Sequence, residues 1–317
     1  MKALIYKKFG SADELEWVDD WPDPEISSHS VLIKVVAGSV NPKDILLRKG
    51  KFSRTFAREP LPRVSGLDVA GEIIAVGSDV SSFSIGDSVF GMTNIFAGGV
   101  HSEIAKLYQS EIAHSPSNIS ILEASSAPLA ALTALQALRD CCKIEKGQKI
   151  LVNGASGGVG HFAVQIAKIL GAEVHAVCGP RNVQFVESLG ADATYSYTDQ
   201  SATKINLPFD LVFDVFGKFT RSEFARQLGS NGVYVSTVPK LATLRGEALA
   251  RLGVSKASRL VQVRSRSEDL KRIKDWIESG LVVPHVEKMY QVNQAAEAHR
   301  HIESKHTIGK VCIVFSS

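Results

Sequence analysis

The sequence is poor in several kinds of residue, and each shortage excludes a class of protein. Its 317 residues include four cysteines, too few for a disulfide framework, and their spacing does not match zinc-binding motifs. No apolar run approaches the roughly 18 residues of a membrane span. The apolar stretch that follows Met1 is too short for a signal peptide. These absences favour a globular protein of a reducing compartment, and we expect a cytoplasmic location.

The sequence also lacks a large excess of positive or negative charge. The chain has 36 lysines and arginines against 33 acidic residues, a formal net charge of +3, with both signs interspersed. This balance gives no electrostatic reason to expect nucleic acid or an anionic membrane surface as a partner. The hydrophobic content, at 44%, is enough to fill the cores of two domains.

The pattern of predicted secondary structure changes near residue 125, from short strands to strands that alternate with helices. Before it, short strands separated by glycine, such as Ser30–Ala37 and Val69–Val76, indicate an antiparallel, barrel-like domain. After it, apolar strands alternate with helices, as in a parallel sheet covered on both faces. Those strands are expected at Lys149–Val152, Glu173–Val177, Phe209–Phe213, Gly232–Ser236 and Leu260–Val263.

The last part of the chain is expected to rejoin the first domain, because chain ends commonly lie close together. It begins near residue 266, with a helix over Ser267–Ser279 and a final strand over Lys310–Phe315. The predicted fold class is therefore α/β, with residues 1–125 and 266–317 in one domain and 126–265 in the other. We expect Pro239–Ser258 to cover a cleft.

The segment Leu151–Gly160 joins a strand directly to a strongly amphipathic helix pattern. It is typical of a dinucleotide-binding loop, in which small residues let the backbone approach a pyrophosphate at a helix N-terminus. Gly157 and Gly160 keep two of the motif's three glycine positions, and Ala155 takes the first. The candidate binding residues of this loop are Ser156, Gly157, Gly158, Val159 and Gly160.

The same loop also matches the nucleophile elbow of serine hydrolases, with Ser156 as the nucleophile. That hypothesis requires an acid and a histidine downstream at strand ends. Asp214 would supply the acid. The candidate bases lie beyond the run of parallel strands, which disfavours this interpretation; they are His285, His299, His301 and His306.

The end of the second parallel strand indicates which nucleotide is bound. An NAD-binding site typically has a carboxylate about 20 positions after the glycines, which binds the ribose hydroxyls. This chain instead has Cys178-Gly179-Pro180-Arg181-Asn182, with no acidic residue. An arginine there suits a 2′-phosphate through charge-assisted hydrogen bonds, whereas the alternative is a solvated charge at a helix start. The sequence therefore favours NADPH over NADH.

Taken in order, the motifs resemble those of the medium-chain dehydrogenase/reductase superfamily, in its zinc-independent quinone oxidoreductase branch. The resemblance runs from Lys2 to Phe315, and the segment Cys178–Asn182 is most similar to chloroplast-envelope quinone oxidoreductase homologues. The matching pieces are Val40–Asp44, Gly66–Gly71, Gly86–Gly91, Leu132–Ala134, Ala155–Gly160, Ser188–Asp192, Ala298–Arg300 and Gly309–Val311.

The resemblance implies a GroES-like β-barrel catalytic domain formed by both chain ends, a Rossmann domain between them, and a homodimer. It also implies that no metal is bound, because Leu67 stands where zinc-dependent relatives have a histidine and cannot ligate zinc. Without a metal to polarise an alcohol, hydride addition to a quinone or an α,β-unsaturated carbonyl is the expected reaction.

Matched positions give the remaining site residues. Asn41 is expected to face the nicotinamide and donate a hydrogen bond to the substrate oxygen, although an Asn-Pro turn would also select asparagine. Thr133 is expected near the nicotinamide ribose, the alternative being a helix threonine bonded to its own turn. Tyr197 is expected at the 2′-phosphate, the alternative being an ordinary loop tyrosine. Phe216 is expected to contact the cofactor.

Leu46 departs from the family pattern, because many quinone oxidoreductases carry a tyrosine there. The proton for the product is therefore expected from water. Asp44 is expected to cap a helix start and Lys43 to point to solvent. The lone histidines His101 and His175 are expected in structural roles, and so is His161.

The sequence thus predicts an NADPH-dependent, zinc-independent reductase of quinones or α,β-unsaturated carbonyls. The alternatives are a non-catalytic NADPH-binding protein with a structural or regulatory role, which Leu46 favours, and the serine hydrolase described above.

Overall fold

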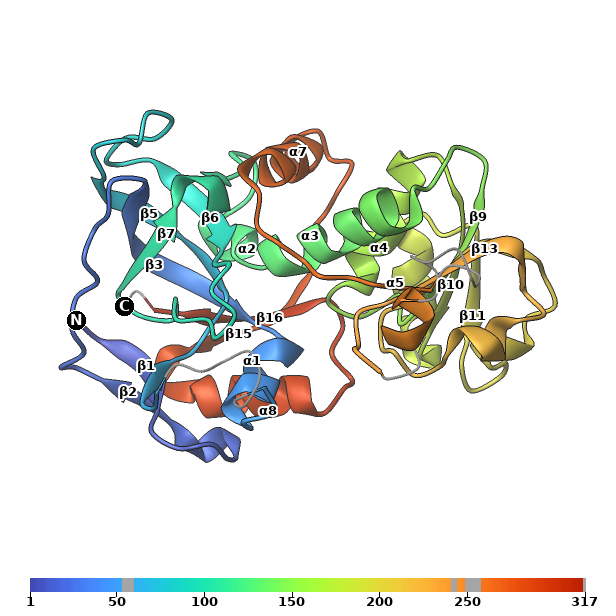
Figure 1. Cartoon of the computed structure of the whole chain (residues 1–317), viewed down its shortest axis with the longest axis horizontal. Coiled ribbons are helices and arrows are strands. Elements are labelled where there is room, and N and C mark those ends of the chain that lie inside the picture. Colours follow the sequence, from blue (N-terminus) through green and yellow to red (C-terminus); the bar gives the residue numbers. More distant parts are fainter. Residues whose placement is uncertain (53–59, 241–243, 249–257, 316–317) are drawn as a thin grey trace. The chain divides into compact units, whose positions relative to one another are not determined.

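The computed structural model describes residues 1–52, 60–240, 244–248 and 258–315, and the chain divides into two compact units (Figure 1). Unit 1 comprises Met1–Leu129 and Arg264–Ser317, and unit 2 comprises Ala130–Val263. The chain passes from unit 1 to unit 2 after residue 129, whereas the sequence predicted this boundary after residue 125. It returns to unit 1 after residue 263, whereas the predicted boundary followed residue 265.

The described residues of unit 1 form two sheets. Their strands are β1 (Ala3–Tyr6), β2 (Leu15–Val18), β3 (Ser30–Val40), β4 (Arg63–Val64), β5 (Asp68–Val76), β6 (Ser88–Met92), β7 (Ile104–Tyr108), β8 (Ile112–His114), β15 (Val286–Gln291) and β16 (Lys310–Val314). The smaller sheet has the order β2-β1-β4. The larger has the order β15-β16-β3-β5-β6-β8, with β7 also paired to β3.

The larger sheet brings the two ends of the chain together. β16 lies antiparallel to β3, with Val311 opposite Val40 and Val314 opposite Ala37. Alternate residues of β3 (Val31, Ile33 and Val35) are buried, as expected for a strand with one face toward a core. The sheet therefore cannot be completed until the last strand has been synthesised.

Unit 2 is built on a parallel sheet with the strand order of a doubly wound nucleotide-binding fold. Its strands are β9 (Lys149–Asn153), β10 (Glu173–Cys178), β11 (Ala193–Ser196), β12 (Phe209–Asp214), β13 (Leu228–Ser236) and β14 (Ser258–Leu260). The order is β11-β10-β9-β12-β13-β14, and every pair is parallel. This confirms the mixed α/β class, with a Rossmann-type sheet in this unit.

The strand predicted at Leu260–Val263 is wrong in its position. β14 occupies Ser258–Leu260, because its pairing with β13 ends at Leu260 opposite Ser236. Most of the predicted covering segment, Pro239–Ser258, lies outside the described residues.

The helices of the described residues are α1 (Pro42–Arg48), α2 (Ile121–Ala124), α3 (Pro128–Gln136), α4 (Gly160–Ile169), α5 (Val183–Ser188), α7 (Ser267–Glu278) and α8 (Ala295–Glu303). Of these, α4 and α7 lie where the sequence predicted helices. α3 continues into a six-residue π-helical segment, Ala137–Cys142. α4 ends where Gly171 adopts a left-handed conformation with φ of 84°, as a glycine after a helix C-terminus often does.

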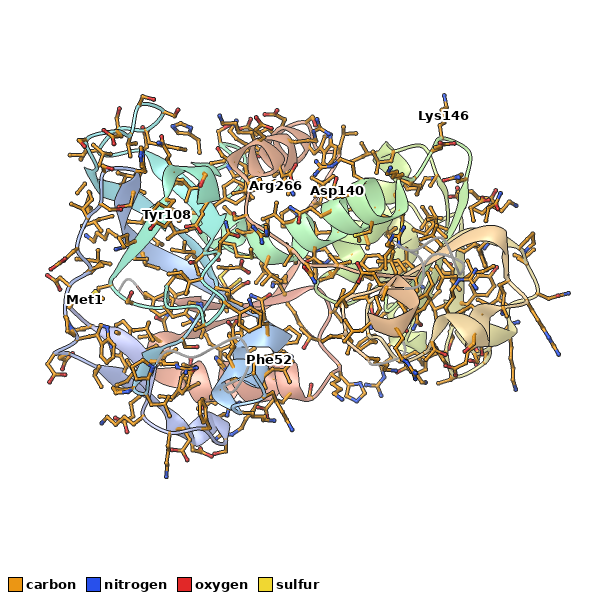
Figure 2. The ribbon with its side chains drawn as sticks, in the orientation of Figure 1. Met1, Phe52, Tyr108, Asp140, Lys146 and Arg266 are labelled. Carbon is orange, nitrogen blue, oxygen red and sulfur yellow. The ribbon has the colours of Figure 1, made fainter. Side chains whose placement is uncertain are left out.

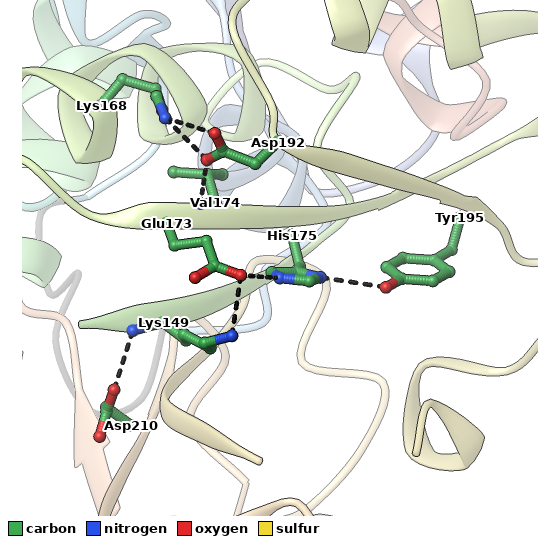
Figure 3. Close-up of polar contacts among 8 residues, drawn as sticks. All are labelled: Lys149, Lys168, Glu173, Val174, His175, Asp192, Tyr195 and Asp210. Carbon is green, nitrogen blue, oxygen red and sulfur yellow. Dashed lines mark hydrogen bonds and ion pairs between the residues drawn. The ribbon is translucent and has the colours of Figure 1, made fainter. Parts of the chain in front are cut away.

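Charged side chains line the amino-terminal end of the parallel sheet (Figure 3). Lys149, at the start of β9, lies 3.0 Å from Glu173, at the start of β10. His175 contacts Glu173 Oε1 through Nε2 at 2.9 Å and the Tyr195 hydroxyl through Nδ1 at 3.0 Å. This confirms the structural role predicted for His175.

Lys146, in the turn before β9, is exposed and projects away from the ribbon (Figure 2). Within the described parts of the chain, no helix is both long enough and apolar enough to cross a membrane.

Candidate functional site

The glycine-rich loop of unit 2 runs from the end of β9 to the start of α4. Gly154 turns the chain sharply with φ of 91°, and the N–H groups of Gly154 and Ala155 both donate to Val177 O at 3.0 Å. Gly154 therefore makes the tight turn. The sequence motif had placed Ala155 at that glycine position, and a positive φ is what distinguishes the two.

Two further glycines of this loop serve different ends. A Cβ on Gly160 would lie 2.0 Å from Gly154 O, so this glycine allows α4 to pack closely on the turn. A Cβ on Gly157 would meet only Gly154 O, at 3.6 Å. Packing within the described protein therefore does not demand glycine at 157. A backbone that approaches a phosphate closely does demand it.

The hydrogen bonds of the loop leave donors at the N-terminus of α4. Gly157 donates to Gly154 O at 3.2 Å, and His161 N donates to Gly157 O at 3.0 Å. Within the described chain, no loop hydrogen bond is donated by the N–H groups of Gly158 and Val159. Such N–H groups, together with the helix dipole, favour a bound anion.

The residues predicted to recognise the 2′-phosphate lie together at the carboxyl ends of β10 and β11. These strands pair in parallel, with Cys178 opposite Ser196, so the residues that follow them are neighbours. Tyr197 N donates to Cys178 O at 3.0 Å, and the Tyr197 hydroxyl lies 3.3 Å from the position of a Cβ on Gly179. Arg181 follows two residues later and is exposed.

Arg181 is available to a ligand. Among the residues that the structure describes, no carboxylate lies within ion-pair distance of it. The neighbouring Asn182 donates from Nδ2 to Ser156 Oγ at 3.0 Å, which ties this segment to the glycine loop. Tyr197 is also 52% exposed, so an arginine and a phenol both face solvent beside the loop.

Phe216 completes this group. It follows β12, its side chain is 51% exposed, and a Cβ on Gly154 would lie 2.5 Å from its ring. The predicted cofactor residues of unit 2 that follow β9, β10, β11 and β12 therefore gather at the carboxyl edge of the sheet, where doubly wound folds bind ligands. These residues fit a dinucleotide. Thr133 lies separately on α3 and is buried, at 5% exposure.

Unit 1 contains a buried polar cluster around Asn41, at the start of α1. The Asn41 side chain is held at both ends: Nδ2 donates to Asp68 Oδ2 at 2.9 Å, and Oδ1 accepts from Lys310 Nζ at 2.6 Å. A longer hydrogen bond of 3.3 Å runs from Nδ2 to Ser39 O. The whole residue is 1% exposed.

Asp68 is the centre of this cluster. Its Oδ2 also accepts from the Ser39 hydroxyl, and its Oδ1 accepts from Leu129 N at 2.8 Å. Lys310 Nζ lies 3.7 Å from Oδ2. Burial raises the pKa of Asp68, and the Lys310 charge opposes that shift. The sequence had matched both residues to family motifs without giving either a role in the site.

Asp44 caps α1, as predicted: its Oδ2 accepts from Asn41 N at 2.8 Å. Burial raises its pKa to about 7, and the nearby Asp68 charge adds to the increase. Lys43 was predicted to point to solvent, and this is wrong. Its ammonium lies 4.1 Å from the centre of the Phe96 ring, where burial lowers its pKa.

The serine hydrolase alternative finds no support in the arrangement of its residues. Ser156 Oγ accepts a hydrogen bond from Asn182 Nδ2, not from a histidine. The proposed acid, Asp214, is buried and accepts hydrogen bonds from Asn153, Phe219 N and the Tyr234 hydroxyl at 2.8 to 3.0 Å. It therefore joins neighbouring strands of the sheet.

The cysteines and the potential metal ligands do not form a second candidate site. No group of three or more His, Cys, Asp or Glu side chains in the described ranges is arranged to hold a metal ion. Burial raises the pKa of the Cys141 thiol to about 11, and that of Cys142 also rises well above its usual value. Thiols in that state are poor nucleophiles at neutral pH.

Comparisons with known proteins agree with this architecture. Residues 27–116 match the alcohol dehydrogenase GroES-like domain family, and residues 189–313 match a family described as zinc-binding dehydrogenase. The chain is 32% identical to the chloroplast envelope quinone oxidoreductase homolog of Arabidopsis thaliana, over 99% of this chain and 98% of that protein.

Two further relatives extend the comparison. The NADPH-dependent alkenal/one oxidoreductase of Arabidopsis thaliana is 33% identical over 99% of this chain and 79% of its own length. The solved structure of the quinone oxidoreductase from Coxiella burnetii superposes with a TM-score of 0.90 at 31% identity, covering 100% of this chain and 99% of that one. The chain is therefore an oxidoreductase that belongs to the medium-chain dehydrogenase/reductase family, among the quinone oxidoreductases.

Proposed function

We propose that this protein is an NADPH-dependent, zinc-independent reductase of quinones or α,β-unsaturated carbonyls. The observation that carries the proposal is the exposed Arg181, without a carboxylate partner in the described chain, beside Tyr197 and the glycine loop. A guanidinium and a phenol placed there suit a 2′-phosphate, and the loop suits a pyrophosphate. The names of the relatives above, which include NADPH, quinone and alkenal/one, support the same assignment.

The residues divide the work by position. When bound, NADPH supplies a hydride from C4 of its nicotinamide. In the proposal, Ser156–Gly160 bind the pyrophosphate, with the N–H groups of Gly158 and Val159 as the donors. Arg181 and Tyr197 bind the 2′-phosphate, and Phe216 covers the cofactor beside Gly154. Thr133 binds the nicotinamide ribose. The protein thus fixes the orientation of the reactants, which is a large part of catalysis when no covalent step involves the protein.

Asn41 is proposed to donate a hydrogen bond to the substrate oxygen as negative charge develops on it. One hydrogen of Nδ2 is held by Asp68 at 2.9 Å. The other makes the longer, 3.3 Å bond to Ser39 O, and this is the hydrogen that a substrate oxygen would take. Water then supplies the proton to the product, because Leu46 stands where related enzymes have a tyrosine.

Zinc independence is proposed because the residue between Gly66 and Asp68 is Leu67, which is fully buried and has no metal-binding atom. A homodimer and a cytoplasmic location also remain predictions. Light scattering during size-exclusion chromatography would test the first, and imaging of a fluorescent fusion in the source cell would test the second.

The test of the main proposal is a calorimetric titration of NADPH and NADH into the wild type, Arg181→Ala and Arg226→Ala. Hydrogen bonds to charged groups contribute roughly 1.5–3 kcal/mol, so Arg181→Ala should bind NADPH about 10- to 100-fold more weakly, with NADH unchanged. Arg226 is the matched control because it is an exposed arginine at the amino-terminal end of the parallel sheet, away from the glycine loop. The carbonyl of the next residue, Gln227, accepts from Phe209 N at the start of β12.

Turnover separates the enzyme from a non-catalytic NADPH-binding protein, which Leu46 favours. We expect NADPH oxidation with at least one member of a panel of benzoquinones, naphthoquinones, enals and enones. Tight NADPH binding with no turnover across the panel would support the non-catalytic alternative, and equal affinity for both nucleotides would contradict the assigned role of Arg181.

A further inference from the structure

The buried carboxylate of Asp68 accepts hydrogen bonds on both of its oxygens from two parts of unit 1. Oδ2 receives the Asn41 amide and the Ser39 hydroxyl, and Oδ1 receives the backbone N–H of Leu129. Leu129 lies in the first turn of α3, the helix that carries Thr133 one turn later. One side chain therefore holds the start of α1 and the start of α3.

The chemistry of Asp68 and Lys310 also decides which way the Asn41 amide points. A lysine ammonium only donates hydrogen bonds, and an ionised carboxylate only accepts them. With Lys310 Nζ 2.6 Å from one end of the amide and Asp68 Oδ2 2.9 Å from the other, the oxygen must face the lysine and the NH₂ group must face the carboxylate. The opposite orientation would place donor against donor and acceptor against acceptor.

We propose that Asp68 and Lys310 are positioning residues, which orient the Asn41 amide so that its second N–H is presented to the substrate oxygen and which tie it to the helix that carries Thr133. This inference rests on the proposed function. It assigns a catalytic purpose to a buried ion pair whose members are 242 positions apart (310 against 68) and are both almost completely buried.

A carboxylate is needed at position 68 because both of its ends must accept hydrogen bonds. In Asp68→Asn, the new amide has an acceptor at one end only, so either Asn41 or Leu129 N faces an NH₂ group. Lys310 also loses its nearest negative charge. We expect kcat to fall at least tenfold, while the Kd for NADPH stays within about twofold because the residues that bind its phosphates are in unit 2.

A role in stability alone would also follow from burial, so a second variant separates the two. The exchange Asn41→Asp with Asp68→Asn keeps the number of charges. The amide then at position 68 can accept from Leu129 N through its oxygen, and its NH₂ group can donate to the carboxylate then at position 41 and to the Ser39 hydroxyl oxygen. That carboxylate can accept from Lys310, and an aspartate is as good as an asparagine before the first turn of a helix. The exchange therefore restores these hydrogen bonds, but it gives up the 3.3 Å bond to Ser39 O and leaves the side chain at position 41 without an N–H.

The experiment measures unfolding midpoint, NADPH affinity, kcat and KM for the wild type, Asp68→Asn and the exchanged double variant, with the best quinone or enone of the panel. Ser102→Ala is the control for stability, since it removes a partly buried hydrogen bond of 2.9 Å to Ile104 O elsewhere in unit 1. We expect the double variant to recover most of the lost stability and to remain at least tenfold low in kcat.

Two results would overturn the inference while the proposed function stands. Wild-type kcat in Asp68→Asn would show that the orientation of Asn41 does not depend on the carboxylate. Wild-type kcat in the double variant would show that the pair serves stability alone. No turnover by the wild type with any acceptor would instead contradict the proposed function, and the inference would fall with it.

Discussion

Gly157 and Gly160 are three residues apart in the same loop, yet an added methyl group would meet different surroundings at each. At Gly160 it would lie 2.0 Å from Gly154 O, whereas at Gly157 the nearest described atom is 3.6 Å away. Overpacking of this kind costs roughly 1–3 kcal/mol, and a site with open space costs little. We expect Gly160→Ala to lower the free energy of unfolding by about that amount and Gly157→Ala to change it by less than about 0.5 kcal/mol.

Gly157→Ala should weaken nucleotide binding even though it hardly changes stability. A methyl group there occupies the space through which a pyrophosphate approaches the backbone, so Gly157→Ala should weaken NADPH binding at least tenfold although the fold is unchanged. Urea denaturation and calorimetric titration of the two variants give both quantities. Wild-type affinity in Gly157→Ala would mean that the loop does not hold the pyrophosphate.

At this scale, the sequence was sufficient to locate the strand, turn and helix of the glycine loop, while the binding roles of its residues stay predictions. The small residues of the loop and the missing carboxylate near Arg181 are visible as strings, because a strand, a turn and a helix follow one another within ten residues. The partnership of Lys310 with Asn41 was not visible, since it joins residues 269 positions apart. The conformational role of Gly154 was also missed, because a motif does not report φ.

Among the helices, α1 has an unusual N-terminus, since the carboxyl group that caps it is completely buried. Burial raises the pKa of Asp44 to about 7, with Asp68 adding to the shift and Lys310 and Lys43 opposing it. In the unfolded chain an aspartate titrates near 3.9. Between these two values the folded state binds more protons than the unfolded state, so this group makes the protein less stable as the pH rises from about 4 to 7.

Asp44→Asn should remove that dependence, because an asparagine oxygen still accepts from Asn41 N and carries no titrating proton. We expect the variant to gain stability relative to the wild type as the pH rises, by roughly 2–4 kcal/mol above pH 7 compared with pH 4. The measurement is the difference between the two urea denaturation curves at each pH. Taking the difference cancels the contributions of the buried His101 and His299. Their lowered pKa values make the protein more stable as the pH rises, opposite to the effect of Asp44. A difference independent of pH would contradict the prediction.

The helices and strands were predicted well where their apolar periodicity is strong. Their ends were predicted less well where pairing with another strand sets them. α4 and β10 follow from runs of apolar residues, because both elements are buried along almost their whole length. β3 extends three residues beyond the predicted end because Val40 pairs with Val311 of the last strand. β14 is displaced toward the N-terminus because its register is fixed by β13, not by its own apolar residues.

The whole chain combines a continuous unit with a discontinuous one. Unit 2 is a single segment with its own parallel sheet, whereas unit 1 depends on β16 lying between β15 and β3. The sequence predicted this division from the change in periodicity near residue 125 and from the last strand. It did not reveal the buried contacts that fix the final segment, among them Arg48, which is fully buried and pairs with Glu303 of α8.

This division leads to a prediction about truncation. Ending the chain after Gly309 removes β16, with the fully buried Val311, Cys312 and Ile313, and leaves β3 and β15 without their shared neighbour. We expect unit 1 to lose its fold, so that limited proteolysis removes residues before Ala130, while a fragment containing unit 2 is protected by NADPH. Turnover should be abolished.

The matched control ends after Phe315, which keeps β16 complete together with the hydrogen bond from Phe315 N to Val36 O. We expect that chain to resist proteolysis and retain turnover, since its strand pairs with β3 through Val314 opposite Ala37 are intact. Calorimetry measures NADPH binding in both truncations, and it is preferable to tryptophan emission because Trp17, Trp21 and Trp276 all belong to unit 1. If the chain that ends after Gly309 bound no NADPH, unit 2 would depend on unit 1 for its fold, and the two units would have to be treated as one cooperative structure.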